Sequence, residues 1–269
     1  MLHAPDSTDA LTRNILNILG DHPLGDAREA RTRVQALLTR VPPGELPEAV
    51  WPLLESLWQA ETHGRQPTVA FDLPRLAKHG WASRVSLWRG DITTLAAQAI
   101  VNAANSGLTG CNHPMHACVD NAIHTAAGPW LREACGRIMA ERGRPESTAT
   151  ATLTPRFFLP AAHVLHTVGP IVHGGRPSLG DERDLSQCYT ACCEAAVPWP
   201  AGPMPRNLAF CSISTGVFGY PIAQAAPRAL ATVRAVLERE PSLEQVVFVT
   251  YSAHDAAVYA AAAQEALHV

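Results

Sequence analysis

The sequence predicts an α/β sandwich with a largely parallel or mixed central sheet, preceded by a small helical extension. From residue 85 onward, short apolar runs alternate with stretches of helical periodicity, which is typical of a sheet covered by helices. Before residue 75, apolar residues recur at helical spacing. We therefore divide the 269-residue chain into a helical extension, residues 1–75, and an α/β domain, residues 76–269.

The extension is predicted to contain three helices. The first follows the apolar residues from Leu11 to Leu19 and ends at Gly20, and the others cover about residues 26–38 and 47–58. We expect their Trp and Leu side chains to pack on the main domain. The alternative is that these helices bind a partner or shape a substrate site, and no residue of the extension favours it.

In the α/β domain we expect six strands and four helices. The strands are predicted at residues 85–88, 99–102, 148–154, 164–168, 208–213 and 246–251. The helices are predicted at residues 119–141, 181–197, 222–239 and 254–267. A loop with four prolines, residues 198–205, is expected to form a rigid surface connection.

The composition excludes several classes of protein. With 47% hydrophobic residues the chain can bury a sizeable core, and with a net charge of −3 it has no basic field for nucleic acid or anionic membranes. Lys78 is the single lysine, and His79 follows it where a Walker A loop needs Ser or Thr, so a P-loop nucleotidase is excluded. A Schiff-base lysine is nearly excluded because only this one candidate exists.

The cysteines and the hydropathy pattern indicate a cytoplasmic protein. Seven cysteines, with Cys192 and Cys193 adjacent, fit no obvious disulfide framework. The first twenty residues lack the pattern of a secretory signal, and the most apolar stretch, residues 256–263, is too short to span a bilayer. We interpret Cys188, Cys192, Cys193 and Cys211 as core residues, the last of them within a strand.

Three segments directly follow predicted strands, where open α/β sheets bind ligands. They are residues 89–93, 102–110 and 212–221, and we expect them to converge on one site. The third segment has small residues, glycines and a helix start, so its backbone amides can point at phosphate oxygens. Taken alone, such a turn can equally serve only to reverse the chain.

Polar side chains in the first two segments have two interpretations each. Asp91 can accept a hydrogen bond from an exocyclic amine such as that of adenine, or it can cap a helix. Asn102 and Asn105 can donate to sugar hydroxyls, or they can form turns. The residues by themselves leave both alternatives open.

Cys111, His116 and Cys118 place three ligand-type side chains within eight residues, a set that suits zinc. The spacing is not that of a common zinc finger, and His113 and His124 are the candidates for a fourth ligand. Three protein ligands with one open position describe a catalytic zinc. The alternative is a pair of ordinary buried cysteines beside a loop histidine.

Asp120 follows Cys118 at the start of a predicted helix. A carboxylate next to a metal ligand can act as a general base or accept a hydrogen bond from a ribose hydroxyl. It can equally stabilise the positive end of the helix dipole. His166, in the predicted strand 164–168, is interpreted as a hydrogen-bonded structural histidine.

Four motifs, in order, resemble the macrodomain signature over about residues 82–267. They are Gly90-Asp91-Ile92-Thr93, Ile100-Val-Asn-Ala-Ala-Asn105, Leu159-Pro160 leading to His166-Thr-Val-Gly-Pro170, and Ser214-Thr-Gly-Val-Phe-Gly-Tyr-Pro221. Residues 110–128 further resemble the zinc-dependent branch, in which a Cys/His/Cys insertion replaces the glycine-rich stretch before the aspartate. Members of that branch are also similar in carrying a helical extension.

The resemblance implies a three-layer α/β/α macrodomain with a mixed central sheet that binds ADP-ribose. It implies that Asp91 and Ile92 hold the adenine, and that the distal ribose lies by Asn105, Val119, Asp120 and Asn121. The diphosphate would lie against Ser214, Thr215, Gly216, Val217 and Phe218, with Tyr251 as an aromatic near the ligand. The zinc ligands implied are Cys111, His116 and Cys118.

In the zinc-dependent branch, the implied activity is hydrolysis of mono-ADP-ribose from protein side chains, with an Asp or Glu ester as the expected linkage. In this hypothesis Asp120 orients or deprotonates the attacking water and Asn105 fixes the ribose hydroxyls. The alternative is a non-catalytic ADP-ribose reader with a structural zinc. One departure from the family is Asn112, where relatives usually have an aromatic residue, and the lost apolar contact is expected to loosen the metal loop or change what docks there.

The expected partners are ADP-ribose and a mono-ADP-ribosylated protein. Relatives of the zinc-dependent branch are often encoded with a lipoyl-carrier protein, which makes such a carrier a candidate substrate. No membrane partner is expected. Nucleic acid is not expected either, because the chain has no arginine-rich patch interleaved with aromatic residues.

Overall fold

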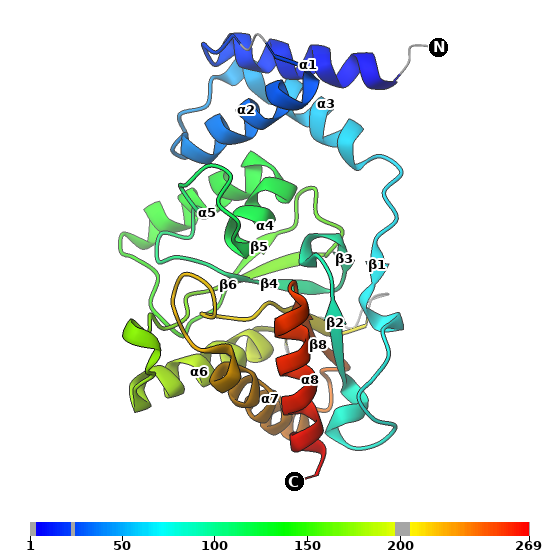
Figure 1. Ribbon diagram of the computed structural model, residues 1–269. Helices are drawn as coiled ribbons and strands as arrows, with labels where there is room; N and C mark the ends of the chain where they lie inside the picture. Colours follow the sequence, from blue (N-terminus) through cyan, green and yellow to red (C-terminus); the bar gives the residue numbers. More distant parts are fainter. Residues whose placement is uncertain (1–3, 23–24, 197–204, 269) are drawn as a thin grey trace.

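The computed structural model describes residues 4–22, 25–196 and 205–268, and Figure 1 shows a helical unit stacked on an α/β domain. The unit consists of α1 (Ala4–Ile18), α2 (Ala27–Arg40) and α3 (Trp51–Thr62). The three predicted helices of the extension are therefore confirmed. Residues 198–204 of the predicted proline loop lie outside the described residues.

The helical unit has a hydrophobic core of its own. Nine buried residues form it: Ile15, Leu16, Ala30, Val34, Leu38, Val50, Leu54, Leu57 and Trp58. Local signals fix the helix ends, because the Asp26 side chain caps α2 and Pro52 occupies the first turn of α3. Tryptophans also join the unit to the α/β domain, since the rings of Trp51 and Trp130 lie 5.6 Å apart.

The central sheet has six strands in the order β2-β8-β7-β4-β6-β5. Their bounds are β2 (Val85–Arg89), β4 (Ala99–Ala103), β5 (Thr152–Pro155), β6 (His163–Thr167), β7 (Asn207–Phe210) and β8 (Gln245–Thr250). All neighbouring strands are parallel except β5 and β6, so the predicted mixed sheet is confirmed. A small pair, β1 (Thr68–Val69) with β3 (Leu95–Ala96), was not predicted.

Helices cover both faces of this sheet, as Figure 1 shows. The helices α4 (Val119–Ala127) and α5 (Pro129–Arg142) lie between the sheet and the helical unit. The other face carries α6 (Leu179–Ala196), α7 (Ile222–Arg239) and α8 (Ala253–Leu267). Covered on both faces, β7 and β8 are buried along their whole length, which explains why most of their residues are apolar. Among the described residues, no helix has the length and apolar character needed to cross a membrane.

Three predicted element boundaries are wrong. The predicted helix 119–141 is two helices, because Gly128 adopts a positive φ of 83° and Pro129 starts a new first turn. The predicted strand 148–154 begins only at Thr152, since the preceding residues wrap around the carboxylate of Glu146. The predicted strand 208–213 ends at Phe210, where the chain turns into the candidate site.

Candidate active site

The three predicted segments converge on one cavity of about 940 Å³ at the carboxyl ends of the parallel strands. Residues 90–93 follow β2, Asn105 follows β4, and residues 211–218 follow β7. Tyr251 lines the rim with an 81% exposed side chain. Cys211, interpreted as a strand residue, lies just beyond β7 and also lines this cavity.

Asp91 caps a short turn and borders the cavity at the same time. Its Oδ1 accepts hydrogen bonds from the backbone amide of Thr93 at 2.9 Å and from the Thr93 hydroxyl at 2.8 Å. The capping interpretation is therefore confirmed. Both Asp91 and the buried Ile92 line the cavity, where the resemblance placed them.

The glycine loop (residues 212–221) presents backbone amides on one wall. Its turn is held by Ser214, which has a positive φ of 64° and accepts at its carbonyl from the Tyr220 amide at 3.0 Å. Within the described part of the chain, no protein acceptor takes the amide N–H groups of Gly216, Val217 and Phe218. Consecutive unpaired amides in a tight loop suit an anion such as a diphosphate.

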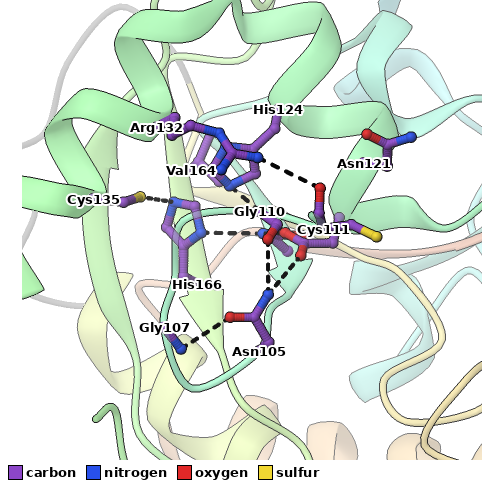
Figure 2. A network of polar contacts seen from close by, with 12 residues as sticks. Asn105, Gly107, Gly110, Cys111, Asn121, His124, Arg132, Cys135, Val164 and His166 are labelled. Atoms are coloured by element: carbon purple, nitrogen blue, oxygen red, sulfur yellow. Dashed lines mark hydrogen bonds and ion pairs between the residues drawn. The ribbon is translucent and has the colours of Figure 1, made fainter. Parts of the chain in front are cut away.

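The second segment supplies Asp120 with two amide donors, one of which is the Asn105 side chain labelled in Figure 2. Asn102 Nδ2 lies 2.8 Å from Asp120 Oδ1, and Asn105 Nδ2 lies 3.3 Å from Asp120 Oδ2. The interpretation that Asn102 meets a sugar is wrong, because its side chain is fully buried and does not line the cavity. Asn105, in contrast, does line the cavity together with Val119, Asp120 and Asn121.

The environment of Asp120 sets its charge. Burial raises the pKa of this carboxyl to about 6, against the lowering effects of the Asn102 hydrogen bond, the Arg132 charge and the Asn105 hydrogen bond. At neutral pH the group is therefore mostly an anion. A buried, clamped carboxylate at the floor of a cavity can orient a hydroxyl or a water molecule.

The loop cluster (Cys111, His116 and Cys118) brings its three donor atoms within 4.8 Å of one another. Cys111 Sγ and His116 Nδ1 are 3.4 Å apart. Ligands of a tetrahedral zinc ion stand about 3.5–3.8 Å apart, so the donor set and its spacing fit zinc. His113 and His124 are not part of this group.

Two asparagines tie the metal loop (residues 111–118) to the helices. Asn121 donates from Nδ2 to the His116 carbonyl at 2.9 Å, and its backbone amide donates to Cys118 Sγ at 3.4 Å. Asn112 Oδ1 accepts a hydrogen bond of 3.0 Å from the buried Arg132 of α5. Asn112 thus anchors the metal loop through a polar contact, which does not support the expectation that it loosens the loop.

The Cys118 thiol of the loop cluster has to lose its proton to bind a metal ion. Burial, together with the nearby Cys111 and Asp120, raises the pKa of the Cys118 thiol to about 11, although the Asn121 amide partly offsets this. A coordinated metal ion deprotonates such a thiol outright. The cluster is half-buried and lines the cavity, which leaves it accessible.

Residues of the helical unit line the same cavity, a placement that agrees with the alternative interpretation that the extension shapes a substrate site. They are Arg31, Gln35, Trp58, Glu61 and Arg65. The predicted packing on the main domain is confirmed by the bonds of Gln35 Nε2 and Trp58 Nε1 to Thr125. No sequence signal could have found the lining role, because it depends on contacts between residues about ninety positions apart.

Comparison with known proteins agrees with this architecture. The family model for the Macro domain matches residues 101–229. A Treponema medium protein named protein-ADP-ribose hydrolase is 51% identical over 176 residues, which is 64% of each chain. A mutant Oceanobacillus iheyensis macrodomain with ADPR has a TM-score of 0.63 at 34% identity and covers 71% of this chain and 98% of that one. A Trypanosoma brucei macrodomain in complex with ADP-ribose has a TM-score of 0.62 at 27% identity, covering 84% and 93%.

This chain belongs to the macrodomain family. The predicted macrodomain fold with a mixed central sheet and preceding helices is confirmed. The matched region spans a little less than two thirds of the length of the Treponema medium relative.

Proposed function

We propose that this protein is a zinc-dependent hydrolase that removes mono-ADP-ribose from modified protein side chains and releases ADP-ribose. The observation that carries the proposal is a single cavity lined by Asp120, the loop cluster, Asp91 and the glycine loop. A carboxylate and a metal-type cluster beside an anion-binding loop form a hydrolytic site rather than a simple ligand pocket. The relative named protein-ADP-ribose hydrolase supports the same activity.

Cys111, His116 and Cys118 would hold the zinc. When bound, it supplies a Lewis acid with an open coordination position. Hydrogen bonds of Asn112 and Asn121 anchor the metal loop to the helices. Such support around a metal site helps to keep the ligands in place.

The chain's own residues bind and orient the substrate. Amides of the glycine loop hold the diphosphate, and Asp91 with Ile92 holds the adenine, so binding energy comes from groups remote from the bond that breaks. Asn105 fixes the hydroxyls of the distal ribose, while Val119 and Asn121 flank them. Asp120, an anion near neutral pH, orients the water that attacks the anomeric carbon.

We propose an ester of a protein Asp or Glu as the linkage. In this reaction the bond between the anomeric carbon and the carboxylate oxygen breaks, the water oxygen bonds to the carbon and gives one proton to Asp120, and the side chain leaves as a carboxylate. A carboxylate is a good leaving group, so a strong general acid is not required. A lipoyl-carrier-type protein is the proposed substrate.

The test is release of ADP-ribose from a protein that carries mono-ADP-ribose on an acidic side chain. We expect release by the wild-type protein, loss of release with a zinc chelator and recovery when zinc is restored. Asp120→Ala should lower kcat by at least about 100-fold. If nothing is released while calorimetry still detects ADP-ribose binding, the protein is a reader and the hydrolase proposal fails.

A further inference from the structure

Asn102 uses both hydrogens of its buried side-chain amide. Its Nδ2 lies 2.8 Å from Asp120 Oδ1 and 3.1 Å from Nδ1 of His166, the ring labelled in Figure 2. The nitrogen of this amide, and not its oxygen, therefore faces Asp120. Asn102 Oδ1 is buried and has no partner among the described residues, so it contributes nothing to the orientation.

His166 stands directly beside Asn102 in the sheet. The two residues are register partners on the parallel strands β4 and β6. The other ring nitrogen of His166, Nε2, lies 2.9 Å from the Thr154 hydroxyl on β5. Because Nδ1 accepts from Asn102, the proton of the neutral ring is on Nε2 and points to Thr154. Complete burial lowers the pKa of His166 to about 4, which keeps the ring neutral in this role.

The two amides that clamp Asp120 are held in different ways. Asn105 is fixed by local backbone, since its Oδ1 accepts from the Gly107 amide at 2.9 Å and its Nδ2 also donates to the Gly110 carbonyl at 3.0 Å. Asn102 has no comparable backbone contact among the described residues. Its second anchor is the ring of His166, which comes from another strand.

We propose that His166 is a positioning residue, which acts through the Asn102 amide to hold the Asp120 carboxylate in its working orientation. This inference rests on the proposed function, because the orientation matters when Asp120 directs a water molecule. Turning the amide over would place Asn102 Oδ1 against a carboxylate oxygen and against the lone pair of His166 Nδ1. Both contacts are repulsive as long as Nδ1 carries no proton. The Thr154 hydroxyl donates to the Val164 carbonyl at 3.4 Å and therefore accepts from His166 Nε2, which holds this tautomer independently of Asn102.

Two substitutions at His166 separate positioning from packing. Asparagine can place an acceptor oxygen near the Nδ1 position, whereas glutamine extends its amide toward the Nε2 position and leaves Asn102 without its acceptor. We expect His166→Gln to lower kcat for ADP-ribose release by about 10–100-fold, with the ADP-ribose Kd unchanged within about 3-fold. We expect His166→Asn to recover most of this loss, to within about 5-fold of wild type.

Cys135→Ala is the matched control. Cys135 Sγ lies 3.8 Å from His166 Nε2, so this variant disturbs the same buried region and spares the contact between His166 and Asn102. Melting temperatures of all three variants report packing. Equal losses of kcat in His166→Asn and His166→Gln, in step with their melting temperatures, would show a merely structural role and overturn the proposal.

Nitrogen-15 NMR of the histidine rings tests the same proposal without measuring ADP-ribose release. We expect His166 to show a protonated Nε2 and an unprotonated, hydrogen-bonded Nδ1 in the wild-type protein. The opposite tautomer would overturn the positioning role even in an active enzyme. A wild-type protein that releases no ADP-ribose would instead overturn the proposed function, and the NMR result would still decide how Asn102 is held.

Discussion

Two clusters of cysteine and histidine lie close to Asp120 and differ in what surrounds them. The loop cluster is half-buried, and its three residues line the cavity. The buried cluster (His124, Cys135 and His166) also has donor atoms within 4.8 Å of one another, but all three residues are buried. Both nitrogens of His166 already have hydrogen-bonding neighbours, and the cationic Arg132 lies nearby.

The two clusters have similar donor atoms at similar distances, so donor type and proximity do not by themselves make a metal site. A site also needs free lone pairs and a path for the ion. The loop cluster meets both conditions, whereas Arg132 does not separate the two clusters, because it also donates to Asn112 and to the Cys111 carbonyl. In the buried cluster, His166 is better explained as support for the Asn102 amide, and burial, with Arg132 close by, lowers the pKa of His124.

The sharpest test of this comparison is one substitution in each cluster. Cys118 Sγ caps α4 by accepting from the Asn121 amide, and serine is a preferred cap, so Cys118→Ser keeps the helix and removes the soft ligand. We expect this variant to lose bound zinc and about 1,000-fold in kcat/KM. Metal analysis and the release assay measure both quantities.

Cys135→Ala is the partner experiment in the buried cluster. We expect it to keep one zinc per chain and kcat/KM within about 3-fold of wild type, with a stability cost of about 1 kcal/mol for the small cavity. If Cys135→Ala lost the metal and Cys118→Ser retained it, our assignment of the two clusters would be reversed.

The same contrast explains how far the sequence could predict the site. The loop cluster lies within eight residues, so local spacing revealed it. The buried cluster is assembled from α4, α5 and β6, and the pairing of β4 with β6 brings His166 to Asn102. No local pattern contains that register. For the same reason, Asn102 and Asn105 could not be distinguished from the sequence, although one is fully buried and the other lines the cavity.

The fold could be predicted from the sequence better than the hydrogen bonds around Asp120, with one avoidable error. Six strands and the helices between them follow from apolar periodicity, because burial on both faces of a parallel sheet leaves continuous apolar runs. The break between α4 and α5 was visible as Gly128-Pro129, a pair that seldom continues a helix. The wall formed by Arg31 and Trp58 was not predictable, since it depends on how the helical unit docks.

Thiol labelling gives a second contrast between the clusters. Burial raises the pKa of Cys135 to about 12 and that of Cys118 to about 11. Cys118 is therefore more accessible than Cys135 and has the larger thiolate fraction, and both differences make it more reactive. After zinc removal, we expect an alkylating reagent at pH 8 to modify Cys111 and Cys118 at least about 100-fold faster than Cys135. Mass spectrometry of the digested protein measures each rate. Equal rates would contradict the burial that separates the two clusters.

A smaller effect, on zinc affinity, is expected when the hydrogen bond between Asn112 and Arg132 is removed. Arg132 donates to Asn112 in the metal loop at 3.0 Å, so Asn112→Ala frees that loop and leaves a buried guanidinium short of one partner. We expect zinc affinity to fall by about 10-fold, measured by competition with a chelator. The matched control is His113→Ala, because His113 is outside the loop cluster and should leave the affinity unchanged.

The smallest predicted effect concerns Glu146, whose charge acts on the buried His166. Burial raises the pKa of Glu146, but hydrogen bonds from Thr152, Thr150 and Arg142 outweigh it, and the net shift is downward. A carboxyl with a lowered folded-state pKa adds stability above its unfolded pKa of about 4.5 and loses it as the pH falls through the folded value. We therefore expect Glu146→Gln to reduce stability by about 1 kcal/mol at pH 7, with the difference shrinking below pH 4.5. Urea unfolding of both proteins across this range measures it, and a difference that grew toward low pH would contradict the sign.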